Sequence, residues 1–201
     1  NGMLLISGIE MHPPGPRAIS WHLLAVGVPE DFPYDETAGA QTLLDRANAA
    51  GAVCFAAHPY WCGFTASEVT SLRGFVGLEV YNASTRRIGK SLNMQIWDEI
   101  LDSGIHYNAI AVDDIHREEH ALKGWTMIAS EERTLPAILN ALRNGHYYAS
   151  TGPEITRLSL EDGVFKAEFS PCAEAILMSN KNTGFGLIEG DFTSLEFDIS
   201  N

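Results

Sequence analysis

The chain has 201 residues and a mass of 22.0 kDa, which suits one domain or slightly more. Hydrophobic residues make up 45% and charged residues 19%, so the chain can bury a core, and its composition disfavours disorder. A formal net charge of −13 disfavours nucleic acid as a high-affinity partner. No apolar run approaches the ~20 residues of a membrane span, so we expect no membrane association. Three cysteines are too few for a disulfide scaffold.

Strand-like and helix-like patterns alternate through most of the chain. Apolar runs rich in β-branched residues predict strands over residues 3–9, 21–28, 52–57, 75–81, 106–112 and 125–129. Apolar stripes with suitable start and stop residues predict helices over 37–50, 92–102 and 135–143. This alternation favours a parallel α/β core, either barrel-like or doubly wound.

The pattern changes after Pro153. Short alternating runs predict antiparallel strands over 155–160, 163–169, 175–178 and 195–199, with a hairpin turn at 161–163 and further turns at 171–172 and 180–184. We therefore expect two domains, a partial α/β domain over 1–154 and a partial β-rich C-terminal extension over 155–201. The sequence does not indicate the role of this extension.

Four short segments place a potential metal ligand at the end of a predicted strand. Their ligands are Glu10, His22, His58, and the pair Asp114 and His116. A hairpin between the first two strands would bring Glu10 beside His22. Active sites of α/β proteins collect residues from several strand ends, and imidazole with carboxylate suits zinc, manganese or iron. A single histidine at a strand edge is more often structural, so the prediction depends on the four segments together.

The ordered motifs resemble the PHP family of metal-dependent phosphoesterases, named for polymerase and histidinol phosphatase. The motifs are Gly-Ile-Glu at 8–10, His-Leu-Leu at 22–24, His-Pro at 58–59, Gly-Leu-Glu-Val-Tyr-Asn at 77–82 and Asp-Asp-Ile-His at 113–116. Residues 124–127 and 145–154 resemble one bacterial branch of the family. The resemblance covers nearly all of residues 1–154. It implies a distorted (β/α)7 TIM-like barrel with two or three divalent metal ions, Mn, Zn or Fe.

The resemblance also implies roles for single residues. The metal ligands would be Glu10, His22, His58, Asp114 and His116. We assign catalytic roles to Glu10, Asp114 and Arg117, because a bridging carboxylate and a nearby cation suit attack of an activated water on phosphorus. Residues placed around the metals or the substrate are Glu79, Asn82, Arg86, Arg87 and Asp113, of which the two arginines are candidate phosphate binders.

The family pattern starts with a His-x-His strand upstream of the Gly-x-Glu strand. Only nine residues precede Glu10 here, and none of them is His or Asp. A complete TIM-type barrel has ~250 residues. We therefore expect an N-terminally incomplete barrel with about half of its metal site, a gap that can leave this chain inactive.

The predicted function is hydrolysis of a phosphoester in a small phosphorylated substrate. Two alternatives stay open: a non-catalytic module that binds metal or phosphate, and a metal hydrolase that cleaves another kind of bond. The sequence does not specify the phosphoester, the metal or the oligomeric state. In the absence of targeting signals, a cytoplasmic location is the default expectation.

Overall fold

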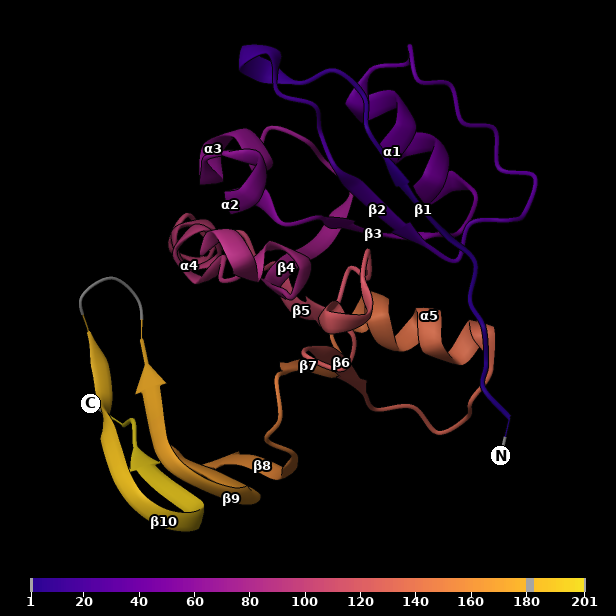
Figure 1. Cartoon of the computed structure of the whole chain (residues 1–201). Helices are drawn as coiled ribbons and strands as arrows, with labels where there is room; N and C mark the ends of the chain where they lie inside the picture. The colour runs from indigo at the N-terminus through magenta and orange to yellow at the C-terminus, as the bar shows by residue number, and fades with distance from the viewer. Residues whose placement is uncertain (1, 180–182, 201) are drawn as a thin grey trace. The chain divides into compact units, whose positions relative to one another are not determined.

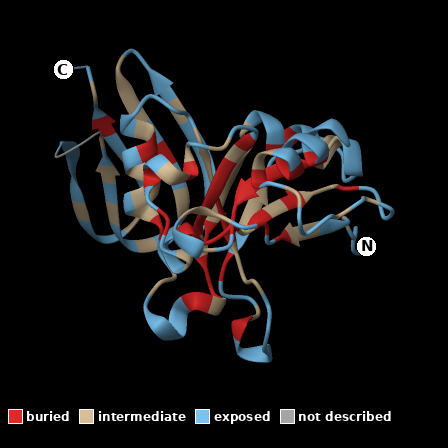
Figure 2. Cartoon of the chain, turned by 90° about the horizontal axis from the view of Figure 1, so that it is seen from above, coloured by how far each residue is buried: buried red, intermediate tan, exposed pale blue. Residues whose placement is uncertain are grey.

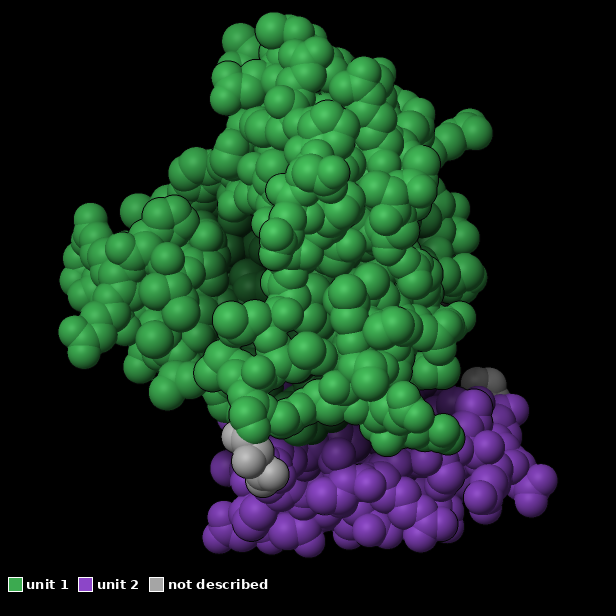
Figure 3. Space-filling view, turned by 90° about the vertical axis from the view of Figure 1, so that its right-hand side faces the viewer, with its two compact units in different colours: residues 1–149 green, residues 150–201 purple. Residues whose placement is uncertain are grey.

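The computed structural model describes residues 2–179 and 183–200 of the chain. The fold divides into two compact units, Asn1–Ala149 and Ser150–Asn201, which are coloured separately in Figure 3. The sequence pattern had placed a boundary near residue 154. Each unit has its own sheet structure, and the units are described in turn.

Unit 1 is built on an open five-stranded sheet in the order β1-β2-β3-β4-β5 (Figure 1). The strands are β1 (Gly8–Met11), β2 (Leu23–Val26), β3 (Val53–Ala56), β4 (Phe75–Asn82) and β5 (Asn108–Val112). The pairs β1–β2 and β2–β3 are antiparallel, whereas the pairs β3–β4 and β4–β5 are parallel. The antiparallel β1–β2 pair is the arrangement that would bring Glu10 beside His22.

Among its described residues, unit 1 also contains five α-helices and three short 3-10 helices. The α-helices are α1 (Ala40–Ala49), α2 (Pro59–Cys62), α3 (Ala66–Val69), α4 (Met94–Asp102) and α5 (Leu135–Asn144). The 3-10 helices are η1 (Pro16–Ala18), η2 (Ser84–Ile88) and η3 (Glu118–His120). Among the described residues, none of these helices is long and apolar enough to cross a membrane.

Helices cover both faces of the five-stranded sheet because its strands are apolar on both sides. Successive side chains of a strand point to opposite faces, so Cys54 packs with the buried residues of α1, α3 and α4, whereas Phe55 packs with those of α5. All four residues of β3 are buried. Figure 2 shows the buried residues, in red, gathered along the central strands. A near-continuous apolar run is typical of a strand covered on both faces.

The predicted (β/α)7 TIM-like barrel is wrong. Within the described part of the chain, β1 and β5 are the two edges of an open sheet, and no strand joins them. The next strands, β6 (Trp125–Ile128) and β7 (Tyr147–Ser150), form a separate two-stranded sheet. Alternation of strands and helices is common to closed barrels and open sheets, and long-range pairing decides between them. The local sequence pattern could not report that pairing.

Unit 2 contains a three-stranded antiparallel sheet of β8 (Ile155–Glu161), β9 (Val164–Met178) and β10 (Gly184–Asp198). Two of the predicted short strands are parts of the single long strand β9, which continues through the turn expected at 171–172. Residues 180–182 of the turn expected at 180–184 lie outside the described residues. The register of β10 against β9 shifts near Phe192, which lets the long ribbon bend.

Candidate metal site

The strand directions bring the candidate ligands to one end of the five-stranded sheet, where the parallel strands β3, β4 and β5 have their carboxyl ends. His58 follows β3 and Asp114 follows β5, so both lie at the carboxyl ends of parallel strands. His22 precedes β2, which is antiparallel to β3, and the His22 carbonyl accepts a hydrogen bond from the backbone of Ala57. Glu10 lies in β1 opposite Leu24. Ligands commonly bind at this end of open α/β sheets.

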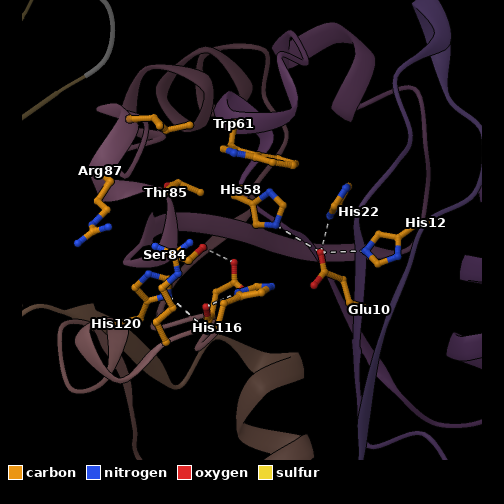
Figure 4. A pocket seen from close by; sticks show the side chains of 13 residues that line it. Glu10, His12, His22, His58, Trp61, Ser84, Thr85, Arg87, His116 and His120 are labelled. Carbon is orange, nitrogen blue, oxygen red and sulfur yellow. Dashed lines mark hydrogen bonds and ion pairs between the residues drawn. The ribbon is translucent and has the colours of Figure 1, made fainter.

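Three histidines surround the Glu10 carboxylate (Figure 4). Its Oε1 atom lies 2.6 Å from Nδ1 of His22, 3.3 Å from Nε2 of His58 and 3.4 Å from Nε2 of His12. The ring centroids of His22 and His58 are 4.8 Å apart. The side chains converge on one small volume from the ends of three strands.

The surroundings of this cluster shift the pKa values of its members. Burial alone would raise the pKa of Glu10, but hydrogen bonds and charge interactions with His22 and His58 hold it well below its usual range. Burial alone would lower the pKa of His58, but contacts with Cys62, Glu10 and Glu79 raise it to about 10. These shifts favour a carboxylate beside a protonated His58 in the metal-free chain, so a metal ion would bind His58 in place of that proton. Carboxylate and imidazole are donor types of a transition-metal site.

Asp114 and His116 form a second group of candidate ligands, which lines the same pocket as the Glu10 cluster. The Nδ1 atom of His116 is 2.9 Å from the backbone oxygen of Asp114 and 3.4 Å from its Oδ1. The Asp114 Oδ2 accepts a hydrogen bond of 2.6 Å from the Ser84 hydroxyl. His116 is exposed, so its imidazole is accessible from the pocket.

A buried polar network connects the two groups of candidate ligands. The backbone N–H of His58 donates to Oε2 of Glu79 over 2.9 Å. The amide of Asn82 donates to the same Glu79 oxygen over 2.9 Å and to Oδ2 of Asp114 over 3.1 Å. Burial raises the pKa of Glu79 to about 7, against the lowering effects of His58 and Asn82. Glu79 and Asn82 therefore hold ligand-bearing segments in place from beneath the pocket.

The two groups of candidate ligands line a pocket of about 580 Å³, which we call the metal-site pocket. Its lining residues are Glu10, His12, His22, His58, Trp61, Ser84, Thr85, Arg87, Ile88, Asp114, His116, Arg117 and His120. Five predicted metal ligands, Arg87 and Arg117 thus share one cavity. This volume is large enough for a small organic ligand.

Two predicted site residues lie elsewhere. The Asp113 carboxylate accepts hydrogen bonds from the backbone N–H groups of Leu122, Lys123 and Gly124, so it fixes the following loop. These three bonds lower the pKa of Asp113, against the raising effect of burial. Arg86 lines a neighbouring cavity, which also receives Arg87.

The sequence analysis missed three side chains of the site. His12 is two residues beyond Glu10, and this spacing in extended chain puts both side chains on one face. Cys62 is four residues beyond His58, at the end of α2, and its Sγ lies 3.5 Å from Nδ1 of His58. His120 is buried beside His116 and lines the metal-site pocket. The two-residue spacing between Glu10 and His12 could have identified His12 from the sequence. The positions of Cys62 and His120 depend on short helices that the sequence did not predict.

The donor set fits a divalent transition metal. The groups His22, His58, Cys62 and Glu10, His12, His22 each have ligand atoms within 4.8 Å of one another. Imidazole nitrogens with a carboxylate or thiolate suit zinc, manganese and iron better than calcium. A comparison with protein-family models and a search of curated proteins both find no match for this chain.

Proposed function

We propose that this chain binds divalent metal ions in the metal-site pocket and hydrolyses phosphoesters there, as its resemblance to the PHP family implies. The observation that carries the proposal is the Glu10 carboxylate, which lies within 3.4 Å of nitrogens from three histidines. Glu10 is partly buried, and a carboxylate beside three imidazoles at this end of an α/β sheet suits a metal centre.

Each group of ligands would have its own part in this function. Glu10, His22 and His58 would hold metal in one group, and Asp114 and His116 would hold it in the other. Divalent ions bound there would lower the pKa of water and offset charge on phosphoryl oxygens. Two or three ions of manganese, zinc or iron suit this ligand set.

The chain's own cations would orient the substrate. Arg117 lines the metal-site pocket next to His116, and its guanidinium can donate two parallel hydrogen bonds to a phosphoryl group. The chain as a whole carries a formal net charge of −13 and repels anions. A small phosphorylated substrate therefore requires the local positive charge of Arg87, Arg117 and bound metal.

Metal content is the first test. We expect the purified chain, loaded with Mn²⁺, Zn²⁺ or Fe²⁺ and desalted, to retain about two equivalents by plasma mass spectrometry. Glu10→Gln and His22→Ala should each lose most of the metal, because both remove a ligand from the same cluster. His106→Ala, at an exposed site outside the pocket, is the matched control and should retain it.

Hydrolysis is the second test. The metal-loaded chain should release phosphate from a panel of phosphomonoesters and phosphodiesters, and Arg117→Gln should lower kcat/KM by on the order of 100-fold. Metal retention without hydrolysis would favour the non-catalytic binding module. Hydrolysis of esters or amides alone would favour a metal hydrolase with another substrate. Lack of metal in a folded chain would contradict the proposal altogether.

A further inference from the structure

A second cavity adjoins the metal-site pocket. It has a volume of about 330 Å³, and we call it the basic pocket. Its lining residues are Ala83, Arg86, Arg87, Glu119, His120 and Lys123. Arg87 and His120 line both cavities, so the two are neighbours that share a wall. This pocket contains none of the proposed metal ligands.

Positive charge is concentrated at these two cavities. The chain has thirteen Lys and Arg residues, and four of them (Arg86, Arg87, Arg117 and Lys123) line one cavity or the other. Among the described residues that line the basic pocket, Glu119 is the single acid. An acidic protein that gathers cations in one cavity creates a local site for anions.

Glu119 occupies the centre of this charge cluster. Its Oε2 lies 3.0 Å from Nη2 of Arg87, and its Oε1 lies 3.9 Å from Nε2 of His120 and 4.0 Å from Nη1 of Arg117. The Arg87 and Glu119 side chains are about two thirds and one half exposed. Exposed ion pairs contribute little to stability, so an incoming anion can displace the Glu119 carboxylate at small cost.

The tautomer of His120 also favours an anion. The backbone N–H of His116 donates to Nδ1 of His120 over 3.3 Å, so this nitrogen accepts and the proton of a neutral ring lies on Nε2. Nε2 is the atom nearest Glu119. The ring therefore presents a donor towards the position that the carboxylate occupies.

We propose that the basic pocket binds a second phosphate group of the substrate, and that Glu119 occupies this position when no substrate is bound. This inference rests on the proposed function, because the scissile phosphoester would lie at the metal ligands next door. The substrate class is then a small molecule with two phosphate groups. Three cationic side chains against one carboxylate leave an excess of positive charge, which suits a dianionic phosphate better than a monoanionic carboxylate.

Phosphate binding to the metal-stripped chain tests the inference independently of hydrolysis. In calorimetric titrations after dialysis against chelator, inorganic phosphate should bind more tightly than acetate. Glu119→Gln should tighten phosphate binding about threefold, because it removes the resident carboxylate. Lys123→Gln should weaken it by a similar factor. Arg46→Gln, at an exposed site on α1, is the matched control and should change nothing.

Several results would overturn the inference. Phosphate binding that disappears with the metal would place the anion at the metal ligands alone. Acetate binding as tight as phosphate binding would exclude the phosphate assignment. Weakening by Arg117→Gln but not by Lys123→Gln would place the anion in the metal-site pocket. Failure of the proposed function is separate, since it would appear as a folded chain that retains no metal.

Discussion

Two of the candidate ligands have a backbone conformation that residues other than glycine rarely adopt. His58 has φ 25° and ψ 58°, and Asp114 has φ 49°. Each residue lies two positions beyond the end of its strand, β3 or β5, and lines the metal-site pocket. Positive φ values cost energy for residues other than glycine, although aspartate tolerates them better than most. Arg17, Ala18, Leu122 and Asp162 also have positive φ, so this conformation is not confined to the candidate ligands.

The strain at Asp114 can be measured by comparing two substitutions. Asp114→Ala and Asp114→Gly both remove the carboxylate, but only glycine tolerates the positive φ. We expect the alanine variant to be less stable than the glycine variant by about 1 kcal/mol in urea unfolding. At Glu99, in the interior of α4, the order should reverse, because alanine is the better helix former by about 1 kcal/mol. Equal stability of the two Asp114 variants would show that the conformation costs nothing.

Glu68 should make folding depend on pH in the acid range. The Arg17 guanidinium and the backbone N–H of Thr65 lower the pKa of Glu68 to about 2 from its ordinary value of 4.5. A lowered folded-state pKa contributes stability that is fully present above the unfolded value. That contribution is lost as the pH falls from about 5 towards about 2. Urea midpoints measured across this range should therefore fall more steeply for the wild type than for Glu68→Gln.

Arg17→Gln provides the control for this pH effect. Because Arg17 is the largest cause of the shift, its loss should flatten the pH dependence nearly as much as Glu68→Gln does. The double variant should then behave like either single variant. If the effects of Arg17→Gln and Glu68→Gln on the pH dependence add in the double variant, the Arg17–Glu68 pair is not its source.

The candidate site was predictable where its residues lie at strand ends. Glu10, His22 and His58 could be found because apolar runs identify strands, and an antiparallel hairpin brings a strand's end to its neighbour's start. His120 could not be found in this way. Its position depends on a short 3-10 helix with no strong sequence signal, and on the buried environment beside His116.

Strands β4 and β5 approach each other closely at Gly77, which pairs with Asn108. A Cβ atom at Gly77 would overlap the backbone oxygen of Asn108. This contact is with backbone, so the strands themselves would have to separate. The glycine therefore keeps β4 and β5 paired, and these strands carry Glu79 and lead to Asp114.

Gly77→Ala should destabilise unit 1 through this contact. We expect a loss of about 1–3 kcal/mol in the free energy of unfolding, the usual range for overpacking. Urea denaturation monitored by tryptophan fluorescence measures the effect. Gly2→Ala is the control, because an added Cβ there has no atom within 4 Å. A stability unchanged by Gly77→Ala would mean that β4 and β5 are not paired in this register.

Element types were easier to predict than element lengths. Helices α4 and α5 have clear apolar stripes with stop signals, and the structure places them within a few residues of the predicted ranges. Strand β9 was predicted as two strands because Pro171 was interpreted as part of a turn. Proline lacks a backbone N–H, yet a long strand can include it where the pairing register is irregular, as it is near Cys172. That irregularity depends on the partner strand β10, which the local sequence does not describe.

At the scale of the whole molecule, the metal-site pocket and the basic pocket belong entirely to unit 1. All residues that line the two pockets lie between Glu10 and Lys123. Both hydrophobic core clusters also consist of residues at or before Ala149. Unit 1 therefore supplies both its own hydrophobic core and all the residues that line its two pockets.

We expect residues 1–149 to fold alone and to bind metal as the whole chain does. The fragment should unfold cooperatively in urea and retain the same metal content, because neither its core nor its ligands come from residues 150–201. Leu43, fully buried in the core between α1 and the sheet, provides a test of equal packing. Leu43→Ala should cost about 2–5 kcal/mol, and the same amount in fragment and whole chain. A fragment that fails to fold, or a smaller Leu43→Ala effect in it, would show that unit 1 depends on unit 2 for its stability.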